Sequence, residues 1–199
     1  SYERGIVTLT RSGGVSAHVV RDENCVAPVF CFDDVTAAYQ FTQEIHEHWD
    51  KLCTRVESTT QHGKLLRVET HQTGSDVAVT FRYHTADAHG MNMMARATDA
   101  AGEWLVGVSG ARRYYILSGF CSEKRASGML FAGGKGKTVV AGARLGADVL
   151  RTHLHVSPTQ LFEMWHHNFL AQTRANVAGY NGHHANGLAA LFIACGQDV

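Results

Sequence analysis

The sequence predicts an α+β protein in which a small domain is inserted into a second domain of mixed, largely helical structure. Between residues 28 and 118, segments with strand and helix patterns follow the order strand–helix–strand–strand–helix–strand. That order is the split β-α-β, or ferredoxin-like, arrangement, in which two helices cover one face of a four-stranded antiparallel sheet. The flanking pieces, 1–27 and 119–199, should pack together as a discontinuous second domain. Two prolines in 199 residues leave no place for a flexible linker between them.

The first strand and the first helix of the small domain follow Pro28. A short apolar run over 29–32 predicts the strand, and a carboxylate cap at Asp33 or Asp34 begins a helix that extends to about Cys53. Two runs, 66–70 and 76–83, then alternate with period two across the turn Thr73-Gly74-Ser75, which is typical of a hairpin. A second helix over 90–104 and a strand-like run over 113–117 complete the small domain.

The C-terminal flank predicts one strand, over 138–143, followed by helices that begin near Ala147, Pro158 and His184. Pro158 stands behind Ser157 at the first helical position, where a proline is well tolerated. Apolar side chains recur at helical spacing in the last two helices, which predicts that both are buried. These side chains are Leu161, Phe162, Trp165, Phe169 and Leu170 in one helix, and Leu188, Leu191, Phe192 and Cys195 in the other.

Charge and composition exclude several classes of partner. Eighteen basic and eighteen acidic side chains cancel, so no general attraction to nucleic acid or to an anionic membrane is expected. No apolar run approaches the length needed to span a bilayer, and no secretory signal pattern opens the chain, so we expect a cytoplasmic protein. The five cysteines form no C-x-x-C pair, and the paired histidines lack the i, i+4 spacing of a chelating helix. No metal site is therefore expected.

The segment Asp87-Ala-His-Gly-Met-Asn-Met-Met94 opens the second helix of the small domain. Unpaired backbone N–H groups at a helix start, together with a glycine that permits close approach, suit an anionic group such as a nucleotide phosphate. Methionines at such a place are, taken alone, more often packing residues of the core. The two interpretations stay open on these residues alone.

This segment, with 118–125, 133–140, 179–186 and 194–198, resembles the catalytic domain of hydroxymethylglutaryl-coenzyme A reductases. The resemblance extends over essentially all 199 residues. The reductase signature for a nicotinamide dinucleotide reads D-A-M-G-M-N-M, and His89 stands here in place of its first methionine. The resemblance implies that NADPH would be bound by Asp87, Gly90, Met91, Asn92 and Met93.

The loop Ser118-Gly-Phe-Cys-Ser-Glu-Lys-Arg125 resembles the reductase sequence S-G-N-Y-C-T-D-K-K. By composition alone, this cluster of charges could equally be a solvated turn. The resemblance implies that Lys124 stabilises charge on the thioester carbonyl oxygen and that Asp198 contacts this lysine. The other site residues that it implies are Glu123, Arg125, Ser118, Phe120, Asn186 and His183.

The chain also departs from the reductase pattern. The shortened loop places Phe120 where the family has Asn-Tyr, while His18 and His166 stand where the family has an arginine and a lysine on the substrate carboxylate. Losing two permanent cations removes charge-assisted hydrogen bonds that contribute about 1.5–3 kcal/mol each. The family's catalytic glutamate and its thiolate-protonating histidine are expected in segments outside these 199 residues.

Three hypotheses follow. The one we favour from the sequence is a repurposed reductase scaffold without a cofactor, a cyclase, isomerase or lyase that acts on a more apolar carbonyl compound. In it Lys124, Arg125 or a histidine would polarise the carbonyl, and His18 or His166 would act as general base. The aromatic residues Phe120, Trp165 and Phe169 would shape the cavity. The second is an NADPH-dependent acyl-thioester reductase, and the third is a non-catalytic binding scaffold. In each, a homo-oligomer is expected, with the site between subunits.

Overall fold

The computed structural model describes residues 2–121, 126–180, 182 and 184–198 of the chain. These residues form two compact units. One unit is Val19–Thr138, and the other combines Ser1–His18 with Val139–Val199. The first contains the predicted small-domain segment 28–118 and extends it at both ends. The division into two functional domains stays a prediction.

The sheet of the Val19–Thr138 unit has the order of a split β-α-β fold. Its strands are β1 (Ser16–Val26), β2 (Val29–Cys31), β3 (Lys64–Thr73), β4 (Asp76–His84) and β5 (Arg113–Tyr115), and β6 (Gly136–Gly142) follows β1 in the order of the same sheet. The order β5-β2-β4-β3 is antiparallel throughout, as predicted, with β3 and β4 joined by the predicted hairpin. The end of β1, Asn24–Val26, extends the sheet by pairing with Phe81–Tyr83 of β4, beyond the stretch that pairs with β2.

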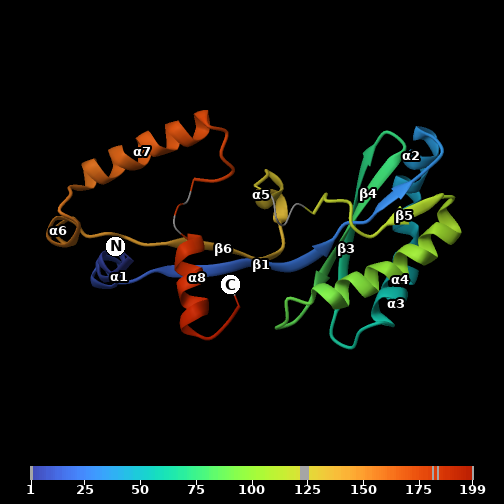
Figure 1. The fold of residues 1–199 in the computed structure, drawn as a ribbon, viewed down its shortest axis with the longest axis horizontal. Helices are drawn as coiled ribbons and strands as arrows, with labels where there is room; N and C mark the ends of the chain where they lie inside the picture. Colours follow the sequence, from blue (N-terminus) through green and yellow to red (C-terminus); the bar gives the residue numbers. More distant parts are fainter. Residues whose placement is uncertain (1, 122–125, 181, 183, 199) are drawn as a thin grey trace. The chain divides into compact units, whose positions relative to one another are not determined.

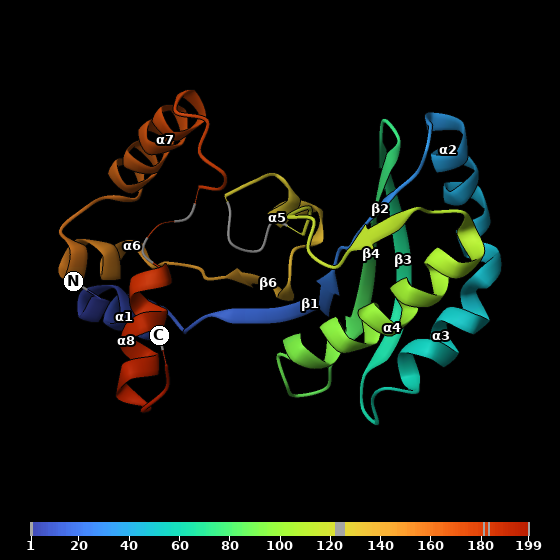
Figure 2. The same cartoon turned by 45° about the vertical axis from the view of Figure 1, so that its right-hand side comes forward.

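Helices cover one face of this sheet (Figures 1 and 2). The predicted single helix over 34–53 is instead α2 (Val35–Glu44), a 3₁₀ turn (Ile45–His48) and α3 (Trp49–Glu57), and the second helix is α4 (Met91–Ser109). Asp34 is the predicted cap, because its carboxylate accepts hydrogen bonds from the N–H groups of Thr36 and Ala37 at 2.8 and 2.9 Å. Large buried side chains join the helices to the sheet, among them Phe30, Phe81, Ile45, Leu52 and Leu105.

The other unit consists mainly of helices. They are α1 (Tyr2–Arg11), α6 (Ala147–Val149) with a π-helical turn (Leu150–Leu154), α7 (Pro158–Arg174) and α8 (His184–Ala194). Ser157 and Gln160 form a reciprocal capping box at the start of α7, with Pro158 in its first turn. Helix α1 contacts the π-helical turn and comes close to α8, since a Cβ added at Gly187 would lie 3.3 Å from the Tyr2 ring. The short helix α5 (Met129–Gly133) and the strand β6 (Gly136–Gly142) precede α6, α7 and α8 along the chain.

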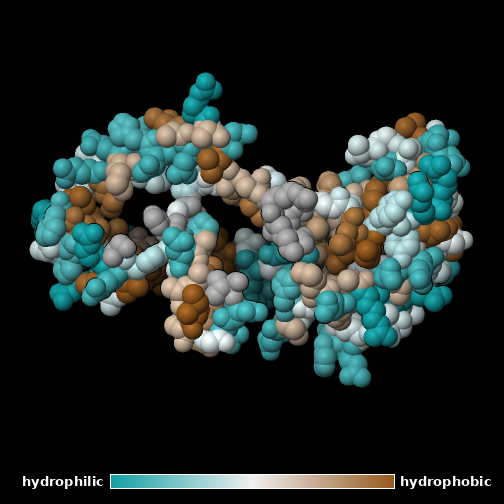
Figure 3. All heavy atoms as spheres, viewed as in Figure 1, coloured by the Kyte–Doolittle hydropathy of each residue, from teal (hydrophilic) through white to brown (hydrophobic). Residues whose placement is uncertain are grey.

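The prediction that α7 and α8 are buried is wrong for the described residues. Neither helix contains a buried residue, and Phe162 and Trp165 are 61% and 49% exposed. Hydrophobic side chains lie at the surface over both helices (Figure 3). The apolar spacing was interpreted correctly as an apolar face, but the contacts that the described residues make with it, such as Tyr180 against Phe169, leave it largely exposed. Within the described part of the chain, no helix combines the length and apolar character that crossing a bilayer requires.

Candidate functional site

The segment that resembles the dinucleotide signature is a shaped turn between β4 and α4. Gly90 caps α4 with φ +72°, a left-handed conformation that side chains other than glycine rarely adopt. A Cβ added at Gly90 would lie 2.9 Å from Cγ2 of Thr85, closer than van der Waals contact allows. The glycine is therefore required twice, by its backbone angle and by its neighbour.

Hydrogen bonds from two buried side chains hold this turn. The hydroxyl of Thr85 donates to the carbonyl of Ala88 at 2.6 Å. Asn24, on β1, donates through Nδ2 to the carbonyl of His89 at 3.1 Å and to the Thr85 hydroxyl at 3.4 Å. Both Asn24 and Thr85 are buried, so the segment is fixed from beneath while its other side faces solvent.

The residues expected to bind the cofactor lie on the solvent side of the turn. Asp87, Met91 and Asn92 are exposed, and Met93 is half-buried against Gly63. Only Met94, the last methionine of the segment, is a buried core residue. The first N–H groups of α4 lack acceptors within the helix and carry its positive dipole end. These N–H groups with their partial positive charge, next to Gly90, fit an anionic ligand.

The loop expected to carry the catalytic lysine lies mostly outside the described residues. This applies to Glu123, Lys124 and Arg125, and also to His183. The residues before them are described: the Ser118 hydroxyl donates to the carbonyl of Ala27 at 2.5 Å and accepts from the N–H of Phe120 at 3.2 Å. The Phe120 ring lies 4.4 Å from that of His71 on β3. Ser118 thus anchors the start of this loop to the junction of β1 and β2.

A charged network that the sequence analysis missed covers the sheet face opposite the helices. Arg82, only 3% exposed, donates to the carbonyls of Gly133 and Gly134 and pairs with Glu69. Buried Glu23 receives two hydrogen bonds from Arg67, at 2.5 and 2.8 Å. These bonds, with the positive charges of Arg67 and nearby arginines, hold the pKa of the Glu23 carboxyl below its ordinary value against the opposing effect of burial.

This network fixes the glycine-rich stretch that precedes β6. Arg21 donates to the carbonyl of Ala132 at 3.3 Å, and Lys137 pairs with Asp22. The sequence signal for the network was present, because Arg67, Glu69 and Arg82 alternate with apolar residues along two strands. Charges on one face of a paired strand are expected to meet across it.

The remaining predicted residues belong to the other compact unit. His18, His166, Asn186 and Asp198 are all exposed. Within the described part of the chain, no hydrogen bond or ion pair joins any two of them. His166 instead stacks on Phe162 along α7, with ring centroids 6.1 Å apart. Their role as one site stays a prediction.

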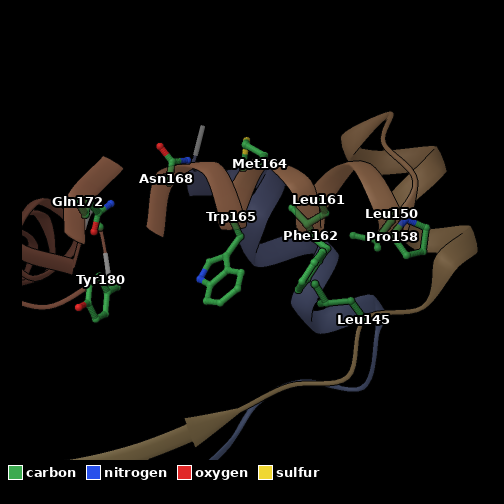
Figure 4. Close-up of a pocket in the computed structure, with 11 residues that line it drawn as sticks. Leu145, Leu150, Pro158, Leu161, Phe162, Met164, Trp165, Asn168, Gln172 and Tyr180 are labelled. Carbon is green, nitrogen blue, oxygen red and sulfur yellow. The ribbon is translucent and has the colours of Figure 1, made fainter. Parts of the chain in front are cut away.

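An open groove runs along α7 in the same unit (Figure 4). Its volume is about 810 Å³, and its walls include Leu145, Phe162, Trp165 and Tyr180. Phe162 and Trp165 project from one side of α7, toward the side on which Leu145 lies (Figure 4). Trp165 lines this groove, whereas Phe120 and Phe169, which were predicted to shape one cavity with it, are not among the lining residues. Among the described residues, no group of three or more His, Cys, Asp or Glu side chains could hold a metal ion.

Comparison with known proteins decides the family. The model of the hydroxymethylglutaryl-coenzyme A reductase family matches residues 1–199. The chain belongs to this family. It is 35% identical over 200 residues to the 3-hydroxy-3-methylglutaryl-coenzyme A reductase of Halobacterium salinarum, covering 100% of this chain and 49% of that relative. The reductase of Methanothermobacter thermautotrophicus is 34% identical, with 50% of its length covered.

Solved structures of hydroxymethylglutaryl-coenzyme A reductases share the fold. The enzyme of Streptococcus pneumoniae matches with a TM-score of 0.68 at 19% identity, covering 96% of this chain and 50% of that one. A structure of the class II enzyme from the same organism, bound to NADPH in open conformations, matches with a TM-score of 0.59 at 17% identity, covering 85% of this chain and 43% of that one. The present chain thus spans about half the length of the curated relatives that it matches.

Proposed function

We propose that this chain carries the dinucleotide-binding part of an NADPH-dependent reductase of hydroxymethylglutaryl-coenzyme A or a related acyl thioester. The observation that carries the proposal is the turn at Gly90. Its positive φ and the close approach of Thr85 and Met93 make the turn one that only glycine fits, and this turn with the exposed start of α4 is the cradle of the proposal. When bound there, NADPH would supply the hydride for reduction.

The residues of the cradle have separate roles in this proposal. Gly90 lets the backbone turn into α4 over Thr85, and the N–H groups of the first turn of α4 would donate to the phosphate oxygens of the ligand. Asn92 and Asp87, both exposed beside the cradle, would orient polar groups of the dinucleotide. Met93, packed on Gly63, would support the cradle from the side of β3.

The chemistry at the thioester stays a prediction for Lys124, which lies outside the described residues, and for Asp198. Lys124 follows the Ser118 anchor by six positions along the chain. A lysine ammonium held near the carbonyl oxygen would stabilise the negative charge that grows on it during reduction.

The non-redox hypothesis that the sequence favoured has weaker support. One observation speaks for it, the apolar groove along α7 with His166 on the same helix, which would suit an apolar substrate. Membership of a reductase family, together with an intact cradle at Gly90, favours the redox hypothesis instead. The reductase proposal therefore replaces the hypothesis of an enzyme without a cofactor, which we favoured from the sequence.

A homo-oligomer remains part of the proposal. The exposed faces of α7 and α8 support it, because apolar patches of this size usually contact another surface. Sedimentation velocity on the purified chain tests it: a Phe162→Glu variant should shift the distribution toward monomer. A wild-type chain that is monomeric at all concentrations would contradict it.

Titration with NADPH tests the cofactor proposal directly. Binding should transfer excitation from tryptophan to the nicotinamide, and it should weaken about tenfold in a Gly90→Ala variant, which corresponds to the loss of about 1.4 kcal/mol. Gly110→Ala is the matched control, since Gly110 lies at the other end of α4 with φ +73° and no atoms near its added Cβ. If the wild-type chain does not bind NADPH, the proposal fails.

A further inference from the structure

Asn24 stands out among the buried polar side chains of the Val19–Thr138 unit. It is 5% exposed, lies on β1 opposite Tyr83 of β4, and no family resemblance singled it out. The two polar atoms of its side-chain amide differ in their hydrogen bonds. Nδ2 donates to the carbonyl of His89 and the hydroxyl of Thr85, whereas Oδ1 is buried and has no hydrogen-bond partner in the described part of the chain.

The orientation of this amide follows from its partner. The His89 carbonyl can only accept a hydrogen bond, so the side of the amide that faces it must be the NH₂ group. That choice leaves Oδ1 without a partner, although a buried acceptor normally finds one. Asn24 thus keeps its bonds to the turn although Oδ1 goes without a partner, which indicates that the bonds to the turn determine how the amide is placed.

The partner of Asn24 is the residue directly before Gly90. Thr85, its second partner, donates to the carbonyl of Ala88, and its methyl group is the atom that a Cβ at Gly90 would meet. Ala86, within the same turn, has a positive φ of 51°, which is costly for a residue with a side chain. The turn is therefore strained, and Asn24 and Thr85 supply the side-chain bonds that hold it.

We propose that Asn24, acting with Thr85, is a positioning residue that orders the Thr85–Met93 segment for the dinucleotide. Asn24 itself contacts no ligand atom. It acts by holding the His89 carbonyl inward, so that the first N–H groups of α4 and Gly90 present a preformed surface. This inference rests on the proposed NADPH function, and it adds a residue from β1 to that site.

Hydrogen exchange on the unliganded protein tests the ordering separately from cofactor binding. An Asn24→Asp variant keeps the size of the side chain but replaces the donor by a carboxylate oxygen facing the His89 carbonyl. Amides of residues 85–93 should then exchange at least tenfold faster, which is the effect of losing one buried hydrogen bond. Amides in the middle of α4, around Ala101, should be unchanged.

Variants at two other positions keep the test informative if Asn24→Asp does not fold. Thr85→Val removes the hydroxyl with little change of shape and should also speed exchange in the turn, whereas Thr85→Ser should restore the wild-type pattern. Thr80→Val is the matched control, because Thr80 is a buried β4 residue whose hydroxyl also lacks a partner but does not contact the turn. It should leave both the exchange and NADPH binding unchanged.

The outcomes separate this inference from the proposed function. If the variants leave exchange in the turn unchanged, the inference is overturned whether or not NADPH binds. If exchange rises but the dissociation constant for NADPH stays within twofold of wild type, ordering by Asn24 does not serve the cofactor, and the inference is likewise overturned. If exchange rises and the wild-type chain fails to bind NADPH, the proposed function is refuted and Asn24 remains the residue that orders the turn.

Discussion

The two glycines that flank α4 offer a quantitative test of how the turn at Gly90 is built. Gly90 and Gly110 have nearly the same backbone angle, φ +72° and +73°. They differ in their surroundings: a Cβ at Gly90 would meet Thr85 at 2.9 and 3.0 Å and Met93 at 3.3 Å, whereas one at Gly110 would meet nothing within 4 Å. Substituting each by alanine therefore separates the backbone cost from the steric cost.

The magnitudes follow from these distances. A left-handed alanine costs about 1–2 kcal/mol, and the lower entropy of the unfolded alanine chain offsets about 0.4–1 kcal/mol of this. Gly110→Ala should thus lower the free energy of unfolding by about 1 kcal/mol. Gly90→Ala should lower it by about 2–4 kcal/mol, because forcing a methyl group into a packed site adds about 1–3 kcal/mol.

Urea unfolding followed by tryptophan fluorescence measures this difference. The chain has three tryptophans, and a Trp165→Phe background leaves Trp49 and Trp104, both packed against the core of the sheet unit. A Thr85→Ser substitution removes the methyl group nearest the added Cβ, so it should recover part of the loss in Gly90→Ala and none in Gly110→Ala. Equal destabilisation by the two alanine substitutions would refute the steric argument.

Three further predictions concern other parts of the molecule. Glu23→Gln should lower the free energy of unfolding by about 2 kcal/mol at neutral pH, less than for a fully buried pair because Arg67 is half-exposed. The pKa of Glu23 in the folded protein lies below its ordinary value of 4.5. The difference in the free energy of unfolding between wild type and Glu23→Gln should therefore be complete above pH 4.5 and vanish as the pH falls through the pKa of the folded protein. A difference that persists in strong acid would argue against the ion pair. Tyr83→Phe should lower the free energy of unfolding by about 1–2 kcal/mol, because the hydroxyls of Tyr83 and Thr98 lie 2.7 Å apart in the core. Adding Thr98→Val should recover part of this loss in thermal unfolding, which a purely steric effect would not do. Trp165→Ala should change the free energy of unfolding by no more than about 0.5 kcal/mol, as for other exposed positions, and a larger loss would mean that α7 is covered in solution.

The helices of the Val19–Thr138 unit show which feature apolar spacing does not predict. Apolar residues at 38, 41, 45 and 52 keep helical spacing, so the sequence predicted one helix where the structure has α2, a 3₁₀ turn and α3. Spacing alone does not reveal such a break, because a short 3₁₀ turn preserves which residues face the sheet. The cap at Asp34 and the hairpin at Gly74 were predicted correctly, since both depend on local chemistry.

Some residues of the candidate site could be predicted from the sequence, and others could not. The Asp87–Met93 segment was recognisable from its residues, and its glycine requirement follows from the turn that the structure shows. Asn24 was not recognisable, because the His89 carbonyl to which it donates lies 65 positions away along the chain. A hydrogen bond between distant segments leaves no periodic trace in the sequence.

The sequence by itself determined the split β-α-β order, the hairpin, the helix caps and the membership of a reductase family. These features depend on side-chain periodicity and on residues that are neighbours in the chain. Only the tertiary structure decided that the apolar faces of α7 and α8 are largely exposed in the described residues. It also decided that charged side chains of the strands hold the glycine-rich stretch, and that an asparagine from β1 bonds to the turn before α4. These features depend on which distant surfaces meet, and packing, rather than local preference, controls that choice.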